Sequence, residues 1–277
     1  MVSDPVTVEK AVEAAEETHD PTQIKAAKAI RRRTYLFEAI LILAAYFVYG
    51  WVRGLVEGHT GDAVHRAHQL VRLERSLHIY HEKAINHFVA SQHWLAYICD
   101  YWYAIMHFLV TIAVGVWIYW KHPEWARQLR TAWYSMNVVA IFGFAFLPLA
   151  PPRLLPGAGF IDTVVKFHTW GSWGSKSVSK DANLYAAMPS MHIGWSLWVA
   201  IAVVLLARRT WVRVLGALYP VATLFVIVGT ANHYFMDAIG GVVACLGGIL
   251  IARLITRRRV LPPLRGPKPL SASPLAG

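Results

Sequence analysis

The feature that most constrains this chain is a series of long apolar runs that are almost free of charge. Residues 131–152, 182–207 and 214–236 contain no Asp, Glu, Lys or Arg, and 84–120 contains only Asp100. Each run reaches the ~20 residues that a helix needs to cross a bilayer. Runs of this length and composition predict membrane-spanning helices.

These runs predict an all-α, polytopic integral membrane protein. Only 16% of the residues are charged, against about a quarter in soluble domains. A further candidate span has Glu38 and Arg53 near its ends. We therefore expect about six spanning helices, at residues 34–56, 94–120, 131–150, 189–207, 211–230 and 233–255.

The two ends of the chain differ in composition from the apolar middle. Residues 1–33 are polar, with acidic positions followed by basic ones, and 257–277 is rich in Pro, Arg and Ser. We expect a polar cytoplasmic N-terminal segment, a six-helix membrane domain at 34–256 and a disordered cytoplasmic tail. Cys99 and Cys245 lie inside apolar runs, where we expect packing thiols rather than a disulfide.

The net charge of +11 is distributed in a pattern typical of membrane proteins. Lys and Arg cluster at 25–33, 121–130, 208–213 and 253–268, beside alternate ends of successive predicted helices. Because basic loops stay on the cytoplasmic side, we expect a multi-pass cell-membrane protein with both termini cytoplasmic. A nucleic-acid partner is the weaker interpretation, since the charge is divided among separate loops. We expect no such partner.

This topology places three polar stretches on the non-cytoplasmic face. They are "LAPPRLLP" (149–156), "AAMPSMHIGW" (186–195) and "TANHYFMDAIGG" (230–241). The loop 151–188 and the connection between the fifth and sixth predicted helices lie on the same side. Stretches that are far apart in the sequence are therefore predicted to meet at one membrane face.

The second stretch opens a predicted helix. Pro189 suits a first helical position, so Ser190 and His192 are expected in the first turn, where free N–H groups favour an anion. His192 beside an anion is suited to deliver or remove a proton. The alternative is that Ser190 only caps the helix and His192 is an interfacial polar residue.

The other two stretches add a histidine–aspartate pair and an arginine. His233 and Asp237 are four residues apart, so we expect them on one helical face, with the carboxylate fixing the imidazole tautomer. Arg153 lies close to prolines, and its planar fork suits phosphate. The alternatives are a buried packing pair and an arginine that reaches lipid headgroups.

Together, Arg153, "PSMH" and "NHYFMD" resemble the three signature blocks of the type-2 phosphatidic acid phosphatase (lipid phosphate phosphatase) superfamily. Within it, "AAMPSMH" and "HYFMDAIGG" are most similar to the inositol phosphorylceramide synthase branch and its bacterial relatives. The resemblance covers roughly residues 60–255 and agrees with the predicted order and membrane side of the blocks.

The resemblance implies an enzyme that cleaves a lipid-linked phosphate ester or pyrophosphate and passes the phosphoryl group to water or to an alcohol. His233 would attack the phosphorus and form a phosphohistidine, Asp237 would orient it, and His192 would protonate the leaving oxygen. No cofactor and no metal are implied, because cationic and backbone donors stabilise the charge. The implied phosphate-binding residues are Arg153, Ser190 and Met191.

Two positions depart from the family pattern. The family usually has a lysine seven residues before its arginine, where this chain has Phe146, and an arginine six residues before its second histidine, where this chain has Ile227. The phosphotransferase branches also depart from the standard third block, which favours a transferase. Candidate replacements are Lys166, Lys176, Lys180, Asn183 and Asn232.

The outer segment 58–93 is rich in histidine. "HRAH" and "HIYH" have the i, i+3 spacing that can bind a metal, but no cysteine joins them. The rows of apolar residues favour helices that lie along the membrane interface. We expect interfacial helices rather than a metal site. The histidines are His59, His65, His68, His78, His81, His87 and His93.

Two other classes of function remain as alternatives. A transporter places its polar groups near the bilayer midplane, whereas the polar stretches here open at helix ends. A bis-histidine haem protein would use His107 or His233. The expected partners are a lipid phosphate substrate and membrane lipids, and the sequence does not decide between water and an alcohol as acceptor.

Overall fold

The computed structural model describes residues 5–34, 36, 40, 47, 60–169 and 187–263. This described part is helical and contains no β-strand, as predicted. The first predicted span, at 34–56, lies outside it except for single positions.

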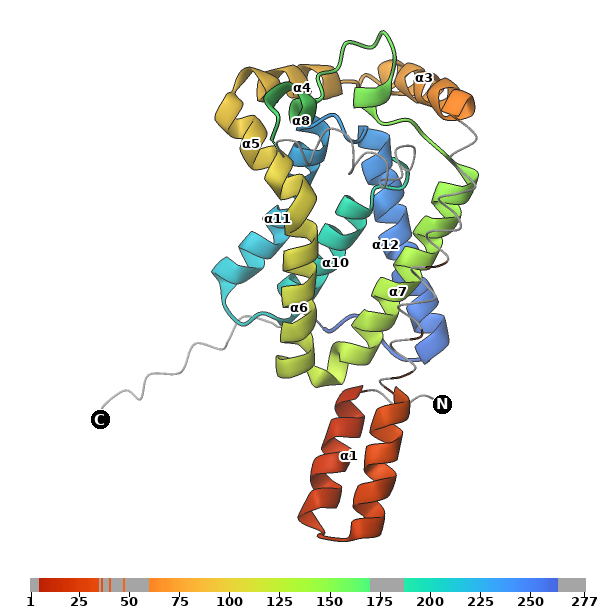
Figure 1. Cartoon of the computed structure of the whole chain (residues 1–277), viewed down its shortest axis with the longest axis vertical. Helices are drawn as coiled ribbons and strands as arrows, with labels where there is room; N and C mark the ends of the chain where they lie inside the picture. Colours follow the sequence, from red (N-terminus) through yellow and green to blue (C-terminus); the bar gives the residue numbers. More distant parts are fainter. Residues whose placement is uncertain are drawn as a thin grey trace, which may run out of the picture.

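The polar N-terminal segment forms a helical hairpin. It consists of α1 (Pro5–Glu17) and a second helix over residues 21–34. Val12, Ala15 and Ala27 are buried between the two helices. An ion pair between Lys28 and Glu16 at 3.0 Å adds a contact across the hairpin, which lies beyond one end of the main helical bundle (Figure 1).

Two helices lie across the opposite end of the bundle (Figure 1). They are α3 (Thr60–Ser76) and α4 (Glu82–Ser91), and they confirm that the segment 58–93 is helical. In α3, Ala63, Ala67 and Val71 are buried, and their spacing of four residues produces one inward-facing stripe.

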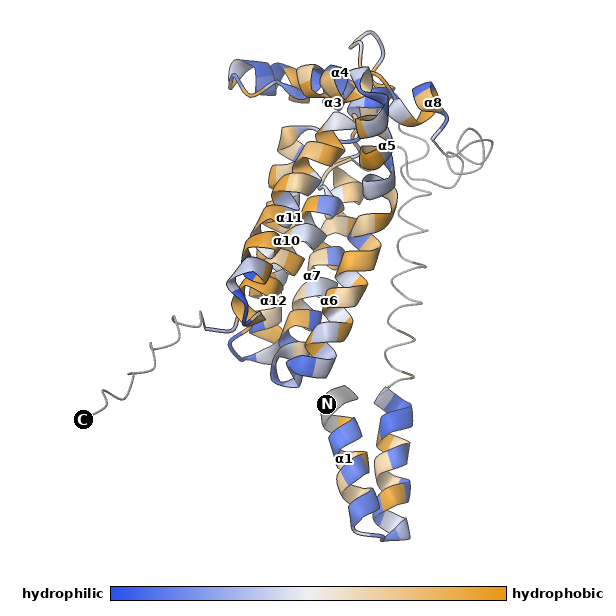
Figure 2. Cartoon of the chain, turned by 90° about the vertical axis from the view of Figure 1, so that its left-hand side faces the viewer, coloured by the Kyte–Doolittle hydropathy of each residue, from blue (hydrophilic) through white to orange (hydrophobic). Residues whose placement is uncertain are grey.

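The bundle itself is a set of long helices that run roughly side by side (Figures 1 and 2). One long element contains α5 (His93–Tyr101), a π-helical turn η1 (Trp102–Met106) and α6 (His107–Lys121). The others are α7 (Pro123–Phe146), α10 (Met191–Leu206), α11 (Thr210–Gly229) and α12 (Phe235–Thr256).

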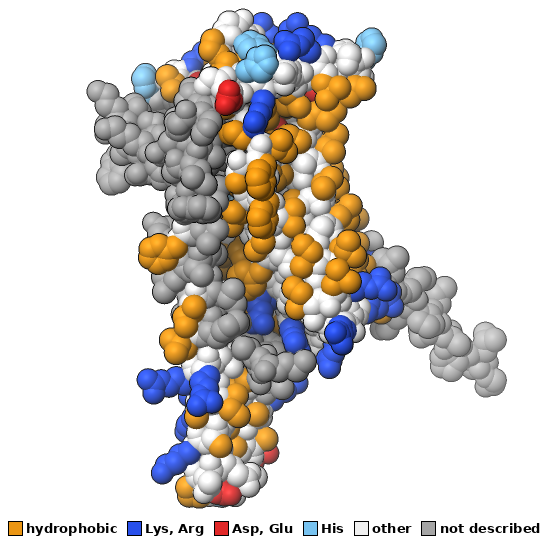
Figure 3. Space-filling model, turned by 90° about the vertical axis from the view of Figure 1, so that its right-hand side faces the viewer, with side chains coloured by type: hydrophobic (Ala, Val, Ile, Leu, Met, Phe, Trp, Pro, Cys, Tyr) orange, Lys and Arg blue, Asp and Glu red, His pale blue; other side chains and the backbone are white. Residues whose placement is uncertain are grey.

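Within the described residues, three helices are long and apolar enough to cross a membrane: His93–Lys121, Thr210–Gly229 and Phe235–Thr256. They correspond to three of the predicted spans. The apolar helix α10 is shorter, and α7 is not in this group. Hydrophobic side chains cover the flank of the bundle between its two charged ends (Figure 3), as expected for a lipid-facing surface.

The helix predicted at 131–150 begins eight residues earlier and ends four residues earlier in the structure. It begins at Pro123 because proline suits a first helical position, and Glu124 lies in the first turn. It ends at Phe146, two residues before Pro148, because proline cannot continue the hydrogen-bond ladder. An apolar run therefore located the helix without fixing its ends.

Two further predictions concern the thiols and the tail. Cys99 and Cys245 are buried and free, which confirms them as packing residues. In the segment predicted as a tail, Val260 is buried in one cluster with Ala132 and Ala252. Residues 264–277, where most of that tail falls, lie outside the described part.

Small residues let α12 approach α7 closely. A Cβ added to Gly248 of α12 would lie 2.6 Å from the carbonyl oxygen of Ala132 and 2.6 Å from the backbone nitrogen of Met136. Both atoms are backbone atoms of α7 and cannot rotate away. This contact sets the spacing between α12, which carries Asp237, and α7, which precedes the loop with Arg153.

Replacing Gly248 with alanine should therefore destabilise the protein by about 1–3 kcal/mol, the usual cost of overpacking. Gly247→Ala is the matched control, because its Cβ would meet Val139 only at an ordinary distance of 3.8 Å. That control should be neutral or slightly stabilising through helix propensity. Thermal unfolding of both variants in detergent tests this, and equal midpoints would contradict it.

Candidate active site

The chain reverses direction between α11 and α12 in a tight turn. Ala231 adopts a left-handed conformation with φ 53°, which is uncommon for a residue with a side chain. The backbone N–H groups of Asn232 and His233 both donate to the carbonyl of Ile227, at 3.0 and 3.1 Å. These bonds close the end of α11 and place His233 just before the next helix.

His233 and Asp237 are in contact, as predicted, although the helix begins only at Phe235. Asp237 is the third residue of α12, and its Oδ2 accepts from the backbone N–H of Tyr234 at 2.8 Å. The same oxygen lies 3.3 Å from Nδ1 of His233. The pair is therefore held by a capping box rather than by one continuous helical face.

The surroundings of His233 fix its tautomer. Its Nδ1 lies 2.9 Å from the carbonyl oxygen of Ala187 and 3.3 Å from Oδ2 of Asp237. Since a carbonyl and a carboxylate only accept, Nδ1 carries the proton and donates. In the neutral imidazole, Nε2 then keeps its lone pair and is available as a nucleophile or base.

The start of α10 is joined to the start of α12. The backbone N–H of Ser190 donates to the main-chain carbonyl of Asp237 at 2.9 Å. A Cβ on Gly241 would lie only 2.3 Å from the carbonyl oxygen of Ser190, so glycine is needed for this approach. The two polar stretches that the sequence predicted on one face meet here through backbone contact.

Ser190 precedes the first residue of α10, Met191, but its side chain makes no capping bond. Its hydroxyl oxygen is buried and has no hydrogen-bond partner among the described residues. Because buried polar groups are normally satisfied, this hydroxyl marks a position where a polar ligand would fit. The simple capping alternative is not what the structure contains.

His192 lies in the first turn of α10, and its ring centroid is 5.6 Å from that of His233. Its Nε2 lies 3.2 Å from the carbonyl oxygen of Tyr103, and its ring stacks on Tyr103 at 4.3 Å. The ring of His107 lies at 4.3 Å on another side. Tyr103 belongs to the π-helical turn η1, an interruption that is frequent at functional sites.

Arg153 lies in a short 3₁₀ turn, η2 (Pro152–Leu154). Its backbone N–H donates to the carbonyl of Ala231 at 2.9 Å. Its Nη1 donates to Oδ1 of Asn232, and its Nε pairs with Asp162 at 3.5 Å. The side chain is about one-fifth exposed, so the guanidinium is held next to the turn that carries His233.

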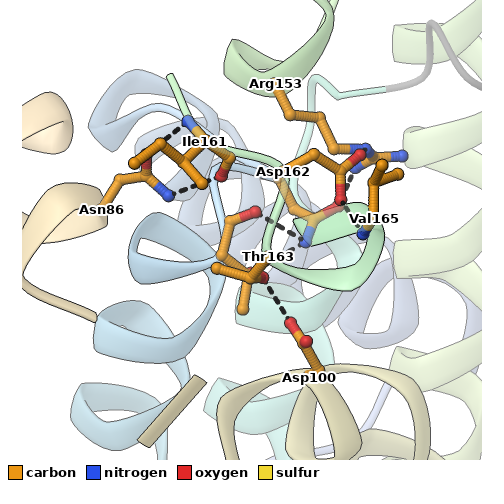
Figure 4. A network of polar contacts seen from close by, with 9 residues as sticks. Asn86, Asp100, Arg153, Ile161, Asp162, Thr163 and Val165 are labelled. Atoms are coloured by element: carbon orange, nitrogen blue, oxygen red, sulfur yellow. Dashed lines mark hydrogen bonds and ion pairs between the residues drawn. The ribbon is translucent and has the colours of Figure 1, made fainter. Parts of the chain in front are cut away.

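A polar network anchors the loop that carries Arg153 and Asp162 (Figure 4). Thr163 and Thr169 donate to the two carboxylate oxygens of Asp100, at 2.5 and 2.6 Å. Asn86 of α4 donates to the carbonyls of Ile161 and Gly229, and accepts from the N–H of Ile161. One buried amide thus connects the outer helix, the loop and the end of α11.

The residues considered as replacements for the missing cations at Phe146 and Ile227 lie in different places. Asn232 accepts from Arg153 and donates to Thr230, so its amide orients the arginine. The ammonium of Lys166 donates to the carbonyl of Ala90 at 3.0 Å, which directs it towards α4. Lys176, Lys180 and Asn183 lie outside the described residues.

The two positions at which the resemblance implied cations carry apolar residues. Phe146 is exposed and Ile227 is fully buried. Across the described part of the chain, no group of three His, Cys, Asp or Glu side chains is arranged to hold a metal.

Several site residues escaped the sequence analysis. Tyr103 gave no signal because an aromatic residue in an apolar run indicates packing, and His107 was considered only as a haem ligand. Glu74 and Glu82, both fully buried, accept hydrogen bonds from the N–H groups of Met236 and Phe235 at the start of α12. Their positions in the sequence form no recognisable spacing pattern. Their positions on the ends of two amphipathic helices were the only available signal.

Comparisons with known proteins gave one match. The model of a family in the PAP2 superfamily matches residues 68–251, a range that includes the three polar stretches. The search of curated proteins and the search of solved structures each returned no significant match.

Replacing Asn86 with alanine should loosen the loop that carries Asp162. The change removes three hydrogen bonds. It leaves the buried carbonyl of Gly229 unsatisfied, at about 1–3 kcal/mol, together with the part-buried N–H and carbonyl of Ile161. Faster amide hydrogen exchange is expected in residues 153–165, measured by mass spectrometry. Gln69→Ala, which removes an exposed amide, is the control, and an unchanged loop in the Asn86 variant would refute this role.

Proposed function

Because the chain belongs to the PAP2 superfamily, we propose that it is a membrane enzyme that transfers a lipid-linked phosphoryl group through a phosphohistidine. Membership of this superfamily supports a phosphatase-type phosphoesterase acting on a lipid phosphate. The observation that carries the proposal is the pair of histidine rings 5.6 Å apart. One ring is oriented by a carboxylate, and the other belongs to His192, two residues after Ser190, whose buried hydroxyl has no partner among the described residues.

In the first step, Nε2 of His233 attacks the phosphorus. A bond forms between this nitrogen and phosphorus, and the bond from phosphorus to the leaving oxygen breaks. The proton on Nδ1 stays in place, where Asp237 and the carbonyl of Ala187 stabilise the positive charge that develops on the ring. His192 gives a proton to the leaving oxygen.

The phosphoryl oxygens are held by the start of α10 and by the arginine. The hydroxyl of Ser190 and the first N–H groups of the helix, from Met191 onward, are donors that favour an anion. The guanidinium of Arg153, held by Asn232 and Asp162, adds positive charge from the opposite stretch. No metal or cofactor takes part in this proposal.

In the second step, the oxygen of water or an alcohol bonds to the phosphorus, and the bond from phosphorus to Nε2 of His233 breaks and frees the imidazole. His192 takes the proton from the attacking oxygen. The resemblance of the second and third blocks to inositol phosphorylceramide synthases and their bacterial relatives supports an alcohol acceptor. The missing cation at Ile227, in the third block, supports the same branch. We therefore propose a phosphotransferase with phosphatase activity as the accompanying reaction.

The proposed topology has six spans, with the first at 34–56 and the site on the non-cytoplasmic face. Basic residues support it: Lys121 and Arg127 adjoin the α6–α7 connection and Arg208 and Arg209 the α10–α11 connection. Both connections lie at the end of the bundle opposite α3 and α4 (Figure 1). The N-terminal hairpin and the tail are then cytoplasmic.

Substituting the two histidines should separate their roles. His233→Ala should abolish a trapped labelled phosphohistidine, because the covalent bond has no other nucleophile. His192→Ala should lower turnover of an alkyl phosphate by on the order of 10²–10⁴-fold, and that of a nitrophenyl phosphate by less, since a good leaving group needs no proton. Rapid-quench trapping at alkaline pH, with turnover assays, measures both effects.

His68→Ala is the control for these variants, because His68 is exposed on α3. It should label and turn over like the unsubstituted protein. A labelled His233→Ala protein would contradict the assigned nucleophile. An equal loss for both leaving groups in His192→Ala would contradict the assigned acid.

Cysteines introduced at exposed positions test the topology. Pro156 lies in the Arg153 loop and Arg209 in the α10–α11 connection. In intact cells, Pro156→Cys should react with an impermeant thiol reagent and Arg209→Cys should react only after lysis. Cys99 and Cys245 are buried and should contribute little background, and the reverse pattern would overturn the proposed orientation.

A further inference from the structure

Three consecutive backbone N–H groups at the start of α12 each donate to a carboxyl group. Tyr234 donates to Asp237 at 2.8 Å, within the capping box already described. Phe235 donates to Oε1 of Glu82 at 3.1 Å, and Met236 donates to Oε1 of Glu74 at 2.9 Å. The last two acceptors come from α4 and α3, about 150 residues earlier in the chain.

Glu74 and Glu82 form a buried pair of carboxyl groups. Both residues have no exposed surface, and their Oε1 atoms accept from the adjacent N–H groups of Phe235 and Met236, which brings the two carboxyl groups together. The second oxygen of each, Oε2, is buried without another partner among the described residues. Two ionised carboxylates can only accept, so a hydrogen bond between them requires one bound proton.

The electrostatic surroundings favour that proton. Burial, the neighbouring Glu82 and the more distant charge of Asp237 together raise the pKa of Glu74 to about 9, against the opposing effect of the hydrogen bond from the N–H of Met236. Other charged or titratable groups near the pair include Arg75, Tyr80 and the buried Tyr234. The guanidinium of Arg75 lies over the Tyr80 ring at 4.8 Å, and burial raises the pKa of Tyr80.

We propose that Glu74 and Glu82 are a shared-proton clamp that positions His233 and Asp237 for phosphoryl transfer. The clamp binds the N–H groups of residues 235 and 236, which lie between the two catalytic residues. One retained negative charge suits a helix N-terminus, whereas two would repel at close range. The catalytic part of this inference rests on the proposed function. Both glutamates are positioning residues and do not touch the substrate.

The clamp has a defined dependence on pH. The pKa of Glu74 is raised from 4.5 to about 9, so the folded state binds this proton more strongly than the unfolded state. The resulting stabilisation of the folded state is complete below about pH 4.5 and is lost as the pH rises to about 9. Above that pH, Glu74 loses its proton and the first turn of α12 loosens.

Glu74→Gln and Glu74→Ala distinguish a proton-sharing clamp from ordinary packing. Glutamine keeps an acceptor for the N–H of Met236 and donates permanently to Glu82, as the protonated acid does. Glu74→Gln should keep neutral-pH turnover within about twofold and lose the decline in thermal midpoint between pH 7 and 10. Glu74→Ala should lower kcat by on the order of tenfold to a hundredfold, with little change in KM, and increase amide exchange in residues 233–237.

An infrared spectrum supplies a direct readout. The unsubstituted protein should show a protonated-carboxyl C=O band at pH 7 that weakens at pH 10, and Glu74→Gln should lack this component. Asp62→Asn, an exposed substitution on α3, is the control and should leave the band unchanged. A Glu74→Gln protein with the same band and the same dependence of thermal midpoint on pH would overturn the shared proton.

The exchange and unfolding measurements need no substrate, so they separate this inference from the proposed function. If the unsubstituted protein turns over no lipid phosphate while the exchange, unfolding and infrared results agree, the clamp stands and the proposed function fails. If turnover occurs and Glu74→Ala has normal kcat and normal exchange in residues 233–237, the clamp fails alone.

Discussion

The structure depends on one residue, Asp237, at the junction of two helices. Its carboxylate receives hydrogen bonds from the N–H of Tyr234 and from the ring of His233, while its backbone carbonyl receives one from Ser190. A single buried residue therefore caps α12, fixes a tautomer and joins the start of α10 to the site. Buried carboxylates are costly unless they are well hydrogen-bonded. Both hydrogen bonds to this carboxylate go to Oδ2, whereas Oδ1 is buried without a partner among the described residues.

Buried polar groups of α3 and α4 contact the segments around this junction of α10 and α12. Asn86 connects the Arg153 loop to the end of α11, and Glu74 and Glu82 bind the first turn of α12. Such groups do not add much net stability by burial, but their directional bonds restrict where the chain can lie. The bundle supplies apolar packing, for example around Gly248. The helices α3 and α4 and the loop that carries Arg153 orient the residues of the candidate site.

The sequence predicted the helical class, the meeting of the three polar stretches and the His233–Asp237 contact. Helix ends were less predictable: α7 begins eight residues before the predicted 131, because apolar content alone does not register a capping proline or a charged first turn. Tyr103, Glu74 and Glu82 were not predicted as site residues. Their roles follow from long-range contacts, which leave no local spacing pattern, and the number of spans also stays a prediction.

The sequence by itself determined that long uncharged runs must become helices and that charged, histidine-bearing segments must lie at their ends, because an apolar solvent excludes unpaired polar groups. It also determined which residue types stand at the three polar stretches. Only the tertiary structure decided that the hydroxyl of Ser190 is buried without a partner among the described residues and that Nδ1 of His233 faces two acceptors. It also decided that Glu74 and Glu82 both bind the first turn of α12. These facts depend on the packing of segments that are distant in the chain, and local sequence does not specify such distances.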